Sequence, residues 1–381
     1  MGNFLENLGT VFQNVTEVTW QMVVMWIIGA VLIYLAIAKE MEPSLLLPMG
    51  FGVILVNLPF SGAITQGTEE GALSILSAAG IDNELFPLLL FIGIGAMIDF
   101  APLLSNPKML LFGAAAQFGI FFTLSMSRLL GFELKDAASI GIIGAADGPT
   151  SIFVANFFRS NYTGAIIVAA YSYMALVPII QPPVIKMVTT KKERLIRMPY
   201  VQKEIPQIVK ILFPIIVTMV AGLVAPRSVS LVGFLMFGNL IRECGVLRAL
   251  SETAQNALAN LVTILLGITV AVQMQAEYFL VWETLMILGL GLVAFIFDTI
   301  GGVMFAKLLN LFSKNKINPM IGAAGISAFP MSSRVVHKMG RDEDPNNYLL
   351  MHAAGANVAG QIASVIAGGL VITLVSSGIF G

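Results

Sequence analysis

Two stretches of the chain read IGAADGPT (residues 143–150) and IGAAGISAFP (residues 321–330), and each lies among long apolar segments. Both begin with the same four residues, and both contain a proline, which cannot continue a regular helix. In the hydrocarbon of a membrane every backbone polar group needs a partner, so an interrupted helix is tolerated only where protein or a cavity surrounds it. Paired interruptions in the two halves of a chain indicate a transporter with a binding site near the middle of the membrane.

The composition of the chain is that of a membrane protein. Of 381 residues, 57% are hydrophobic and 11% are charged, whereas a soluble domain carries about 25% charged residues. The net charge of −1, without a basic stripe, gives no indication of nucleic-acid binding. The single cysteine, Cys244, excludes an internal disulfide and a site of several thiolates. Residues 1–20 hold acidic but no basic side chains, so no cleavable signal peptide is expected.

We therefore predict an all-α polytopic membrane protein with about ten spans and two re-entrant hairpins with broken helices. The interrupted segments, residues 137–158 and 319–333, are assigned to the hairpins. The spans are expected at residues 21–38, 44–60, 85–105, 109–130, 163–183, 211–225, 229–241, 261–275, 284–309 and 348–370.

The distribution of charge predicts the orientation. Residues 186–210 carry seven of the 21 basic residues and only two acidic ones, and loops rich in Lys and Arg face the cytoplasm. The N-terminus lacks basic residues and is expected outside the cell. The N-terminus is thus expected outside and residues 186–210 in the cytoplasm. The number of spans agrees with both locations only if residues 137–158 enter the membrane and return at the outer face, and residues 319–333 do so at the cytoplasmic face.

Hairpins that enter from opposite sides indicate inverted repeats. We expect N-terminal spans over residues 1–84, repeat A over 85–185, a basic cytoplasmic loop with scaffold spans over 186–260, and repeat B over 261–381. We expect the two repeats to form a core whose motion against the scaffold spans gives alternating access.

Asp147 is the first candidate for a functional residue. A carboxylate inside a membrane is costly and usually functional. Pro149 leaves the carbonyl of Ala145 without its helical donor, and a carboxylate with free carbonyl oxygens suits a hard cation such as Na⁺. The alternative is that Asp147 caps the helix that follows. The two roles are compatible.

The second hairpin offers a similar set. Pro330 leaves the carbonyl of Ile326 free, beside the hydroxyl of Ser327. Asn318 fits the N-cap of a helix. Arg334 fits a cytoplasmic anchor, and, as the alternative, its guanidinium can bind a carboxylate at the mouth of a cavity.

Further polar residues lie inside predicted spans. Tyr173 can relay a proton, or its hydroxyl can be satisfied by a backbone carbonyl. Asp298 is either a second cation ligand or proton carrier, or a group that forms a hydrogen bond between helices. Asn357 and Gln361 place two amides four residues apart on the last span. The sequence contains no ATP-binding loop, Ser-His-Asp arrangement or zinc motif.

Together these residues resemble the β subunit of the Na⁺-translocating, biotin-dependent decarboxylases, which include the oxaloacetate, methylmalonyl-CoA and glutaconyl-CoA decarboxylases. The resemblance covers nearly the whole chain. Its specific parts are GAADGPT (144–150), AYSYMALVP (170–178) with QPP (181–183), and NPMIG (318–322) through Ser327 to Arg334.

The resemblance implies an enzyme that receives carboxybiotin from a biotin carrier protein and decarboxylates it. The energy released drives Na⁺ outward while a proton is consumed. The functional positions of the family are all matched in this chain. They imply Na⁺ contacts at Asp147, Gly322 and Ser327, and catalytic or carboxybiotin contacts at Tyr173, Asn318 and Arg334. The resemblance assigns no role to Asp298.

The resemblance also implies a multi-pass protein of a bacterial-type inner membrane. Its implied partners are the biotin carrier, a carboxyltransferase subunit, small membrane-anchoring subunits and further copies of the chain. The chain length favours an acyl-CoA decarboxylase, for methylmalonyl-CoA or glutaconyl-CoA, over the oxaloacetate enzyme. The alternative function is a secondary Na⁺-coupled transporter without chemistry, which needs no docking surface for a biotin carrier.

Overall fold

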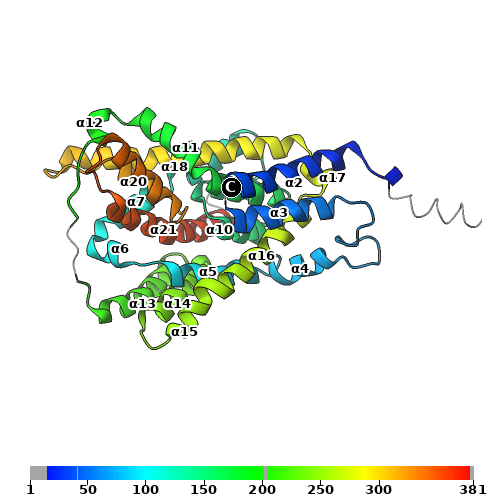
Figure 1. Cartoon of the computed structure of the whole chain (residues 1–381), viewed down its shortest axis with the longest axis horizontal. Helices are drawn as coiled ribbons and strands as arrows, with labels where there is room; N and C mark the ends of the chain where they lie inside the picture. The colour runs from blue at the N-terminus through cyan, green and yellow to red at the C-terminus, as the bar shows by residue number, and fades with distance from the viewer. Residues whose placement is uncertain (1–14, 41, 201–203, 378–381) are drawn as a thin grey trace, which may run out of the picture. The chain divides into compact units, whose positions relative to one another are not determined.

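The fold comes from a computed structural model that describes residues 15–40, 42–200 and 204–377. Its regular elements are helices (Figure 1). The described residues contain no β-strand, only an isolated bridge between Gln66 and Glu69. The prediction of an all-α protein is confirmed.

Among the described residues, seven helices are long and apolar enough to cross a membrane, or up to eight if the bent pair α4 (Ala72–Gly80) and α5 (Leu85–Met97) is one span. The seven are Trp20–Ala38, Pro107–Leu129, Thr163–Val188, Gln207–Val224, Arg248–Gln273, Trp282–Phe312 and Leu350–Ser376. A polytopic membrane protein is thus confirmed. The count of ten is not, because α3 (Pro43–Val56) has 14 residues, α14 (Val229–Glu243) has 15, and α4 meets α5 at 62°. Ten spans and inverted repeats stay predictions.

The contacts of the chain divide it into two compact units. The first runs to Phe86 and includes Asn260–Leu285; the second contains Pro87–Ala259 and the chain from Met286 onward. Both broken segments lie in the second unit. The sequence predicted a different division, into residues 1–84, 85–185, 186–260 and 261–381. That division stays a prediction.

The first unit is held together by a buried amide. Asn57, at the end of α3, donates from Nδ2 to the carbonyls of Val53 (2.8 Å) and Met274 (2.9 Å), and its Oδ1 accepts from the amide of Ala276 (2.8 Å). This one side chain thus satisfies the Val53 carbonyl near the end of α3 and two backbone groups of the segment 274–276. The helices of this unit are α2 (Trp20–Ala38), α3, α4, most of α16 (Ala259–Val270), η5 (Ala271–Gln273) and α17 (Ala276–Phe279).

The second unit is built around α21 (Leu350–Ser376), drawn in red in Figure 1. This helix is the most buried of the candidate spans, and it packs against α6, α7, α10, α14, α19 and α20. It is rich in Gly and Ala, which let neighbouring backbones approach closely.

The remaining helices of the unit are α5, α6 (Ala101–Ser105), η1 (Pro107–Met109), α7 (Leu110–Ala115), α8 (Phe118–Leu129), α9 (Leu134–Gly141), η2 (Ile142–Ala145), α10 (Gly148–Phe158), α11 (Thr163–Val188), α12 (Lys191–Arg194), α13 (Gln207–Val224), η3 (Pro226–Ser228), α14, α15 (Arg248–Thr253), η4 (Ala254–Leu258), α18 (Trp282–Phe312), α19 (Met320–Ala323) and α20 (Met331–Glu343).

Candidate functional site

The first broken segment is a helical hairpin with its break at Ala146 and Asp147. The chain leaves η2 through Ala146, whose φ of +52° is uncommon for a residue with a side chain. Asp147 is extended, and α10 begins at Gly148. The two helical arms, α9 and α10, pack against each other. The break therefore falls where the proline and the aspartate predict it, and the helix does not continue straight through.

Asp147 is buried, with 4% of its surface exposed. Its Oδ2 accepts hydrogen bonds from Thr150 Oγ1 (2.6 Å) and Ser364 Oγ (3.0 Å), and its Oδ1 accepts from the Thr150 amide (3.4 Å). The expectation that Asp147 caps the following helix is confirmed. The hydroxyl of Ser364 comes from α21, so the carboxylate also joins the first hairpin to the central helix.

The second broken segment meets the first through the backbone. Between α19 and α20 the chain is not helical, and here the amide of Ser327 donates to the carbonyl of Ala145 (3.2 Å). This is the carbonyl that lacks a helical donor because of Pro149. The carbonyl of Ile326, freed in the same way by Pro330, accepts from Asn357 Nδ2 (2.7 Å). Each carbonyl that a proline was predicted to leave without a helical donor thus accepts a hydrogen bond from another segment of the chain.

One face of α21 carries the polar groups that serve both breaks. Gln361 Nε2 donates to the carbonyl of Ser327, and Ser327 Oγ donates to the carbonyl of Gly360 (3.1 Å). Asn357 Oδ1 is buried and has no hydrogen-bond partner among the described residues. Positions 357, 361 and 364 follow the helical repeat and lie on one face. Among the polar groups on this side of α21, the carboxylate of Asp147, the hydroxyl of Ser364 and the Oδ1 of Asn357 are possible cation ligands.

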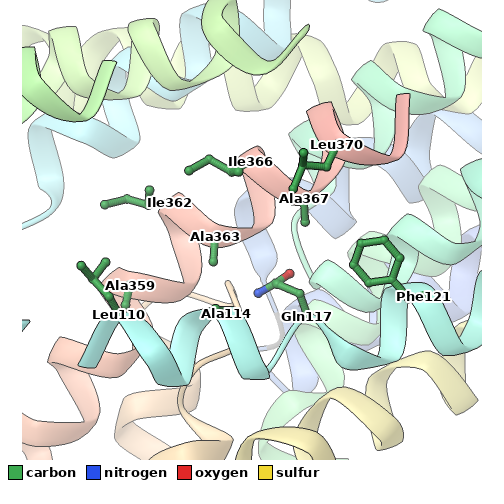
Figure 2. Close-up of a pocket in the computed structure, with 10 residues that line it drawn as sticks. All are labelled: Leu110, Ala114, Gln117, Phe121, Ala359, Ile362, Ala363, Ile366, Ala367 and Leu370. Carbon is green, nitrogen blue, oxygen red and sulfur yellow. The ribbon is translucent and has the colours of Figure 1, made fainter. Parts of the chain in front are cut away.

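The opposite face of α21 lines an apolar groove of about 280 Å³ against α7 and α8 (Figure 2). The groove residues on α21 are Ala359, Ile362, Ala363, Ile366, Ala367 and Leu370. Gln117, at the break between α7 and α8, is its polar member, and its Nε2 donates to the carbonyl of Gly113 (3.0 Å). On α21 itself, Asn357, Gln361 and Ser364 therefore face the hairpins, whereas the residues that line the groove are apolar.

Tyr173 lies on α11 with 9% of its surface exposed. Its hydroxyl donates to the carbonyl of Leu288 on α18 (2.5 Å), which is the backbone partner expected as the alternative to proton relay. Its ring contacts Gly291, and Ile143 of η2 approaches the same glycine. Tyr173 is therefore close to the first break, although its hydroxyl points to α18.

Asn318 is fully buried and holds a segment that we call the strap, residues 189–198. Its Nδ2 donates to the carbonyls of Arg194 (2.8 Å) and Ile196 (2.9 Å), and its Oδ1 accepts from the amide of Met320 (3.1 Å). Asn347 Nδ2 also donates to the carbonyl of Arg194 (3.1 Å). The amide of Asn318 is thus committed to fixing the strap at the start of the second hairpin.

Ion pairs fasten the strap as well. Arg194 pairs with Glu343 (2.6 Å) and Arg197 with Asp344 (2.5 Å). The hydrogen bond from Arg197, with a second from the Asn346 amide, lowers the pKa of Asp344. Burial acts to raise the pKa of Glu193, but hydrogen bonds from Thr190 and the charge of Lys307 outweigh it, and the net pKa is lowered. Three ion pairs therefore fasten the strap, through Arg194, Arg197 and Glu193.

Arg334 and Gly322 differ in their surroundings. Arg334 is exposed on α20, and among the described residues no ion pair involves it. Gly322 packs on Gly302 of α18, where a Cβ at Gly322 would lie 1.9 Å from the Gly302 oxygen. Close approach of two backbones is thus the evident reason for glycine at position 322. Its carbonyl accepts from the amide of Gly325 (3.1 Å).

Asp298 is fully buried in α18. Its Oδ1 accepts from the amide of Gly119 at the start of α8 (2.5 Å), so the expected hydrogen bond between helices is confirmed. Its Oδ2 has no hydrogen-bond partner among the described residues. A Cβ at Gly144 would lie 2.5 Å from that oxygen, so Asp298 faces the first hairpin just before its break.

The sequence interpretation missed several residues of this site. Thr150 and Ser364, which bind the Asp147 carboxylate, and Gln181, which donates to Ala323 (2.7 Å) and Ser332 (2.9 Å), were not candidates. Ser364 could have been found from its helical spacing to Asn357 and Gln361. Gln181 belongs to the QPP motif (181–183) of the resemblance, but the motif assigned it no role, because a glutamine between prolines fits a helix end equally well.

Comparison with known proteins identifies the family. Residues 21–375 match the model of the Na⁺-transporting oxaloacetate decarboxylase beta subunit. The chain belongs to this family. The match contains both broken segments, α11 and nearly all of α21, so every candidate residue of the site lies inside it.

The chain is also similar over most of its length to members of the family with different substrates in their names. It is 51% identical over 354 residues to methylmalonyl-CoA decarboxylase subunit beta of Veillonella parvula, covering 93% of each chain. It is 49% identical to glutaconyl-CoA decarboxylase subunit beta of Acidaminococcus fermentans, covering 98% of this chain and 99% of the other. It is 43% identical to oxaloacetate decarboxylase beta chain of Haemophilus ducreyi, covering 98% and 100%.

Proposed function

We propose that this chain decarboxylates carboxybiotin and uses the energy to move Na⁺ outward across the membrane, with uptake of a proton. The observation that carries the proposal is the contact of the two broken segments, where the Ser327 amide donates to the Ala145 carbonyl (3.2 Å) beside the buried Asp147. A buried carboxylate among unwound backbone suits a transported cation. Family membership supplies the chemistry to which that transport is coupled.

Na⁺ binds, in this proposal, between the first break and α21. Asp147 supplies the negative charge, and Ser327, Asn357 and Ser364 supply neutral oxygens. Oxygen ligands of this kind suit a hard cation. Gly322 contributes by allowing the second hairpin to pack on α18. Asp298, whose Oδ2 near the first break has no hydrogen-bond partner in the described part of the chain, is a further candidate ligand.

The carboxybiotin lies on the side of the strap, which we place in the cytoplasm with the N-terminus outside. Arg334 is exposed there and forms no ion pair with any residue that the structure describes, so its guanidinium is available to a carboxylate. Asn318 acts by holding the strap next to this site. Tyr173 passes the proton to the ureido nitrogen of biotin as CO₂ leaves.

Chemistry and transport must be coupled. Moving one charge outward against about 100 mV costs about 2.3 kcal/mol, and decarboxylation supplies it only if Na⁺ movement accompanies each turnover. We propose that the core with the two hairpins rocks against the rest of the protein to give alternating access. The complex further contains a biotin carrier, a carboxyltransferase, small anchoring subunits and more than one copy of this chain.

The higher identity to the methylmalonyl-CoA and glutaconyl-CoA subunits (51% and 49%) than to the oxaloacetate chain (43%) supports an acyl-CoA as the substrate of the complex. The measurement that decides is decarboxylation by the purified complex of methylmalonyl-CoA, glutaconyl-CoA and oxaloacetate in parallel. Turnover of oxaloacetate alone contradicts this assignment.

The function is tested with Asp147→Asn in reconstituted vesicles. We expect it to abolish Na⁺-dependent decarboxylation of free carboxybiotin and Na⁺ uptake. The matched control is Asp136→Asn, because Asp136 is also a buried carboxylate of the first hairpin, bound to Ser160 (2.6 Å) but away from the break. Retained Na⁺ dependence in Asp147→Asn removes Asp147 from the site. Na⁺ movement by the wild type without consumption of carboxybiotin favours the secondary transporter instead.

A further inference from the structure

A cavity of about 380 Å³ lies between α11 and α20, beside the second broken segment. On α11 its lining residues recur every four positions, so they form one stripe of the helix. Gln181, within this stretch, donates to the Ala323 carbonyl and to Ser332, which lie on the two sides of the break. This part of α11 is therefore fixed to the second hairpin. The lining residues used below are Pro178, Pro182, Lys186, Val335, Lys338 and Asp342.

The charge of the cavity is positive on balance. Lys186 and Lys338 come from its two walls, and both are exposed. Neither has an ion pair among the described residues. Of the two acidic residues in the lining, Glu343 is paired with Arg194 of the strap (2.6 Å), which leaves Asp342 alone against two lysines. Arg334 lies one helical turn before Lys338 on α20 and extends the positive charge toward the break.

The wall formed by α11 offers hydrogen-bond acceptors. Proline has no N–H, so Pro182 leaves the carbonyl of Pro178 without its helical donor, and Pro183 leaves that of Ile179 without one. Pro178 itself lines the cavity, as do the apolar side chains of Val335 and Met339. The residues that line this one cavity thus include cationic side chains, apolar side chains and a proline, Pro178, whose carbonyl lacks its helical donor.

We propose that this cavity is the port through which the carboxylated biotin ring reaches the second break. The carboxylate of the ligand pairs with Lys338 and Lys186 on its way to Arg334. The remaining ureido N–H donates to the carbonyl of Pro178, and the aliphatic arm of the carrier lies along Val335 and Met339. This inference rests on the proposed function, because it takes carboxybiotin as the substrate. It adds four recognition residues, Lys186, Val335, Lys338 and Met339, that lie outside the motifs of the resemblance.

The first experiment measures decarboxylation of free carboxybiotin by Lys338→Gln and Lys186→Gln. We expect each to raise KM about fivefold, as for loss of one partly exposed ion pair, with kcat and the Na⁺ dependence unchanged. Lys192→Gln is the matched control, since Lys192 is an exposed lysine of the strap outside the cavity. An equal rise of KM in Lys192→Gln, or none in the two cavity variants, overturns the port.

The second experiment closes the cavity. Asp342→Cys, made in a Cys244→Ser background, places one exposed thiol in the lining. Labelling with a bulky maleimide should abolish carboxybiotin turnover and leave binding of radioactive Na⁺ intact. Normal turnover after complete labelling contradicts the proposed port but leaves the proposed function intact. Absence of turnover in the unlabelled wild type, by contrast, removes the proposed function and the port together.

Discussion

The amide of Ser327 donates to the carbonyl of Ala145 (3.2 Å), so two broken helices from distant parts of the chain are joined backbone to backbone. Both groups would be unsatisfied if either segment lay alone in a membrane. Each break therefore supplies the partner that the other requires. If one hairpin moves, it must either carry the other with it or exchange this hydrogen bond for another. The hydrogen bond is therefore a physical basis for coupling the movements of the two hairpins.

The contact of α18 with the second hairpin depends on glycine at position 302. A Cβ there would lie 2.1 Å from the Gly322 oxygen, whereas a Cβ at Gly289 on the same helix meets nothing within 4 Å. We expect Gly302→Ala to lower stability by about 1–3 kcal/mol through overpacking. Gly289→Ala should be neutral or slightly stabilising. Thermal unfolding in detergent measures both, and equal melting temperatures contradict the packing.

Removal of the Tyr173 hydroxyl tests the proton step. Tyr173→Phe loses one hydrogen bond, to the Leu288 carbonyl, which costs about 1 kcal/mol of stability. We expect folding and Na⁺ binding to persist while kcat for carboxybiotin falls by about 100-fold or more, the usual contribution of general acid catalysis. Tyr278→Phe, at a tyrosine with 71% of its surface exposed, is the control for loss of a phenol. Unchanged kcat in Tyr173→Phe assigns this tyrosine to packing.

The structural role of Asp298 and its proposed role in cation binding can be tested separately. Asp298→Asn keeps an oxygen that accepts from the Gly119 amide, whereas Asp298→Ala removes it. We expect only the alanine variant to lose about 1–2 kcal/mol of stability, as for other helix caps. Because Oδ2 is unpartnered, we also expect half-saturation of turnover by Na⁺ to rise in Asp298→Asn. An unchanged Na⁺ dependence would restrict Asp298 to the cap.

The attachment of the strap should weaken in acid. Arg197 lowers the pKa of Asp344 below its ordinary value of 3.8, so this carboxylate stabilises the attached strap above that value. The stabilisation is lost as the pH falls through the lowered pKa. Hydrogen exchange of residues 189–198 measures it. We expect protection to fall at acid pH in the wild type and to be weaker already at neutral pH in Arg197→Gln. Equal protection in the two proteins at neutral pH contradicts the role of this pair.

Local sequence predicted the positions of the breaks but not all of their partners. The proline after Asp147 and the proline at position 330 identify carbonyls without helical donors, and the structure gives partners to both, Ala145 and Ile326. Asn318 shows the limit of such reasoning. Its place before Pro319 indicates a cap, and nothing in the neighbouring residues reveals that its amide holds the strap.

The sequence by itself determined a helical membrane protein with two interrupted segments, because apolar length, proline and a buried charge act within a few residues of chain. Only the tertiary structure decided that Ser364 reaches Asp147, that Ser327 meets Ala145, and that Tyr173 points to Leu288. These contacts join residues on separate helices. Their geometry depends on how closely the helices pack, which is a property of the whole assembly of surfaces and not of any one stretch of residues.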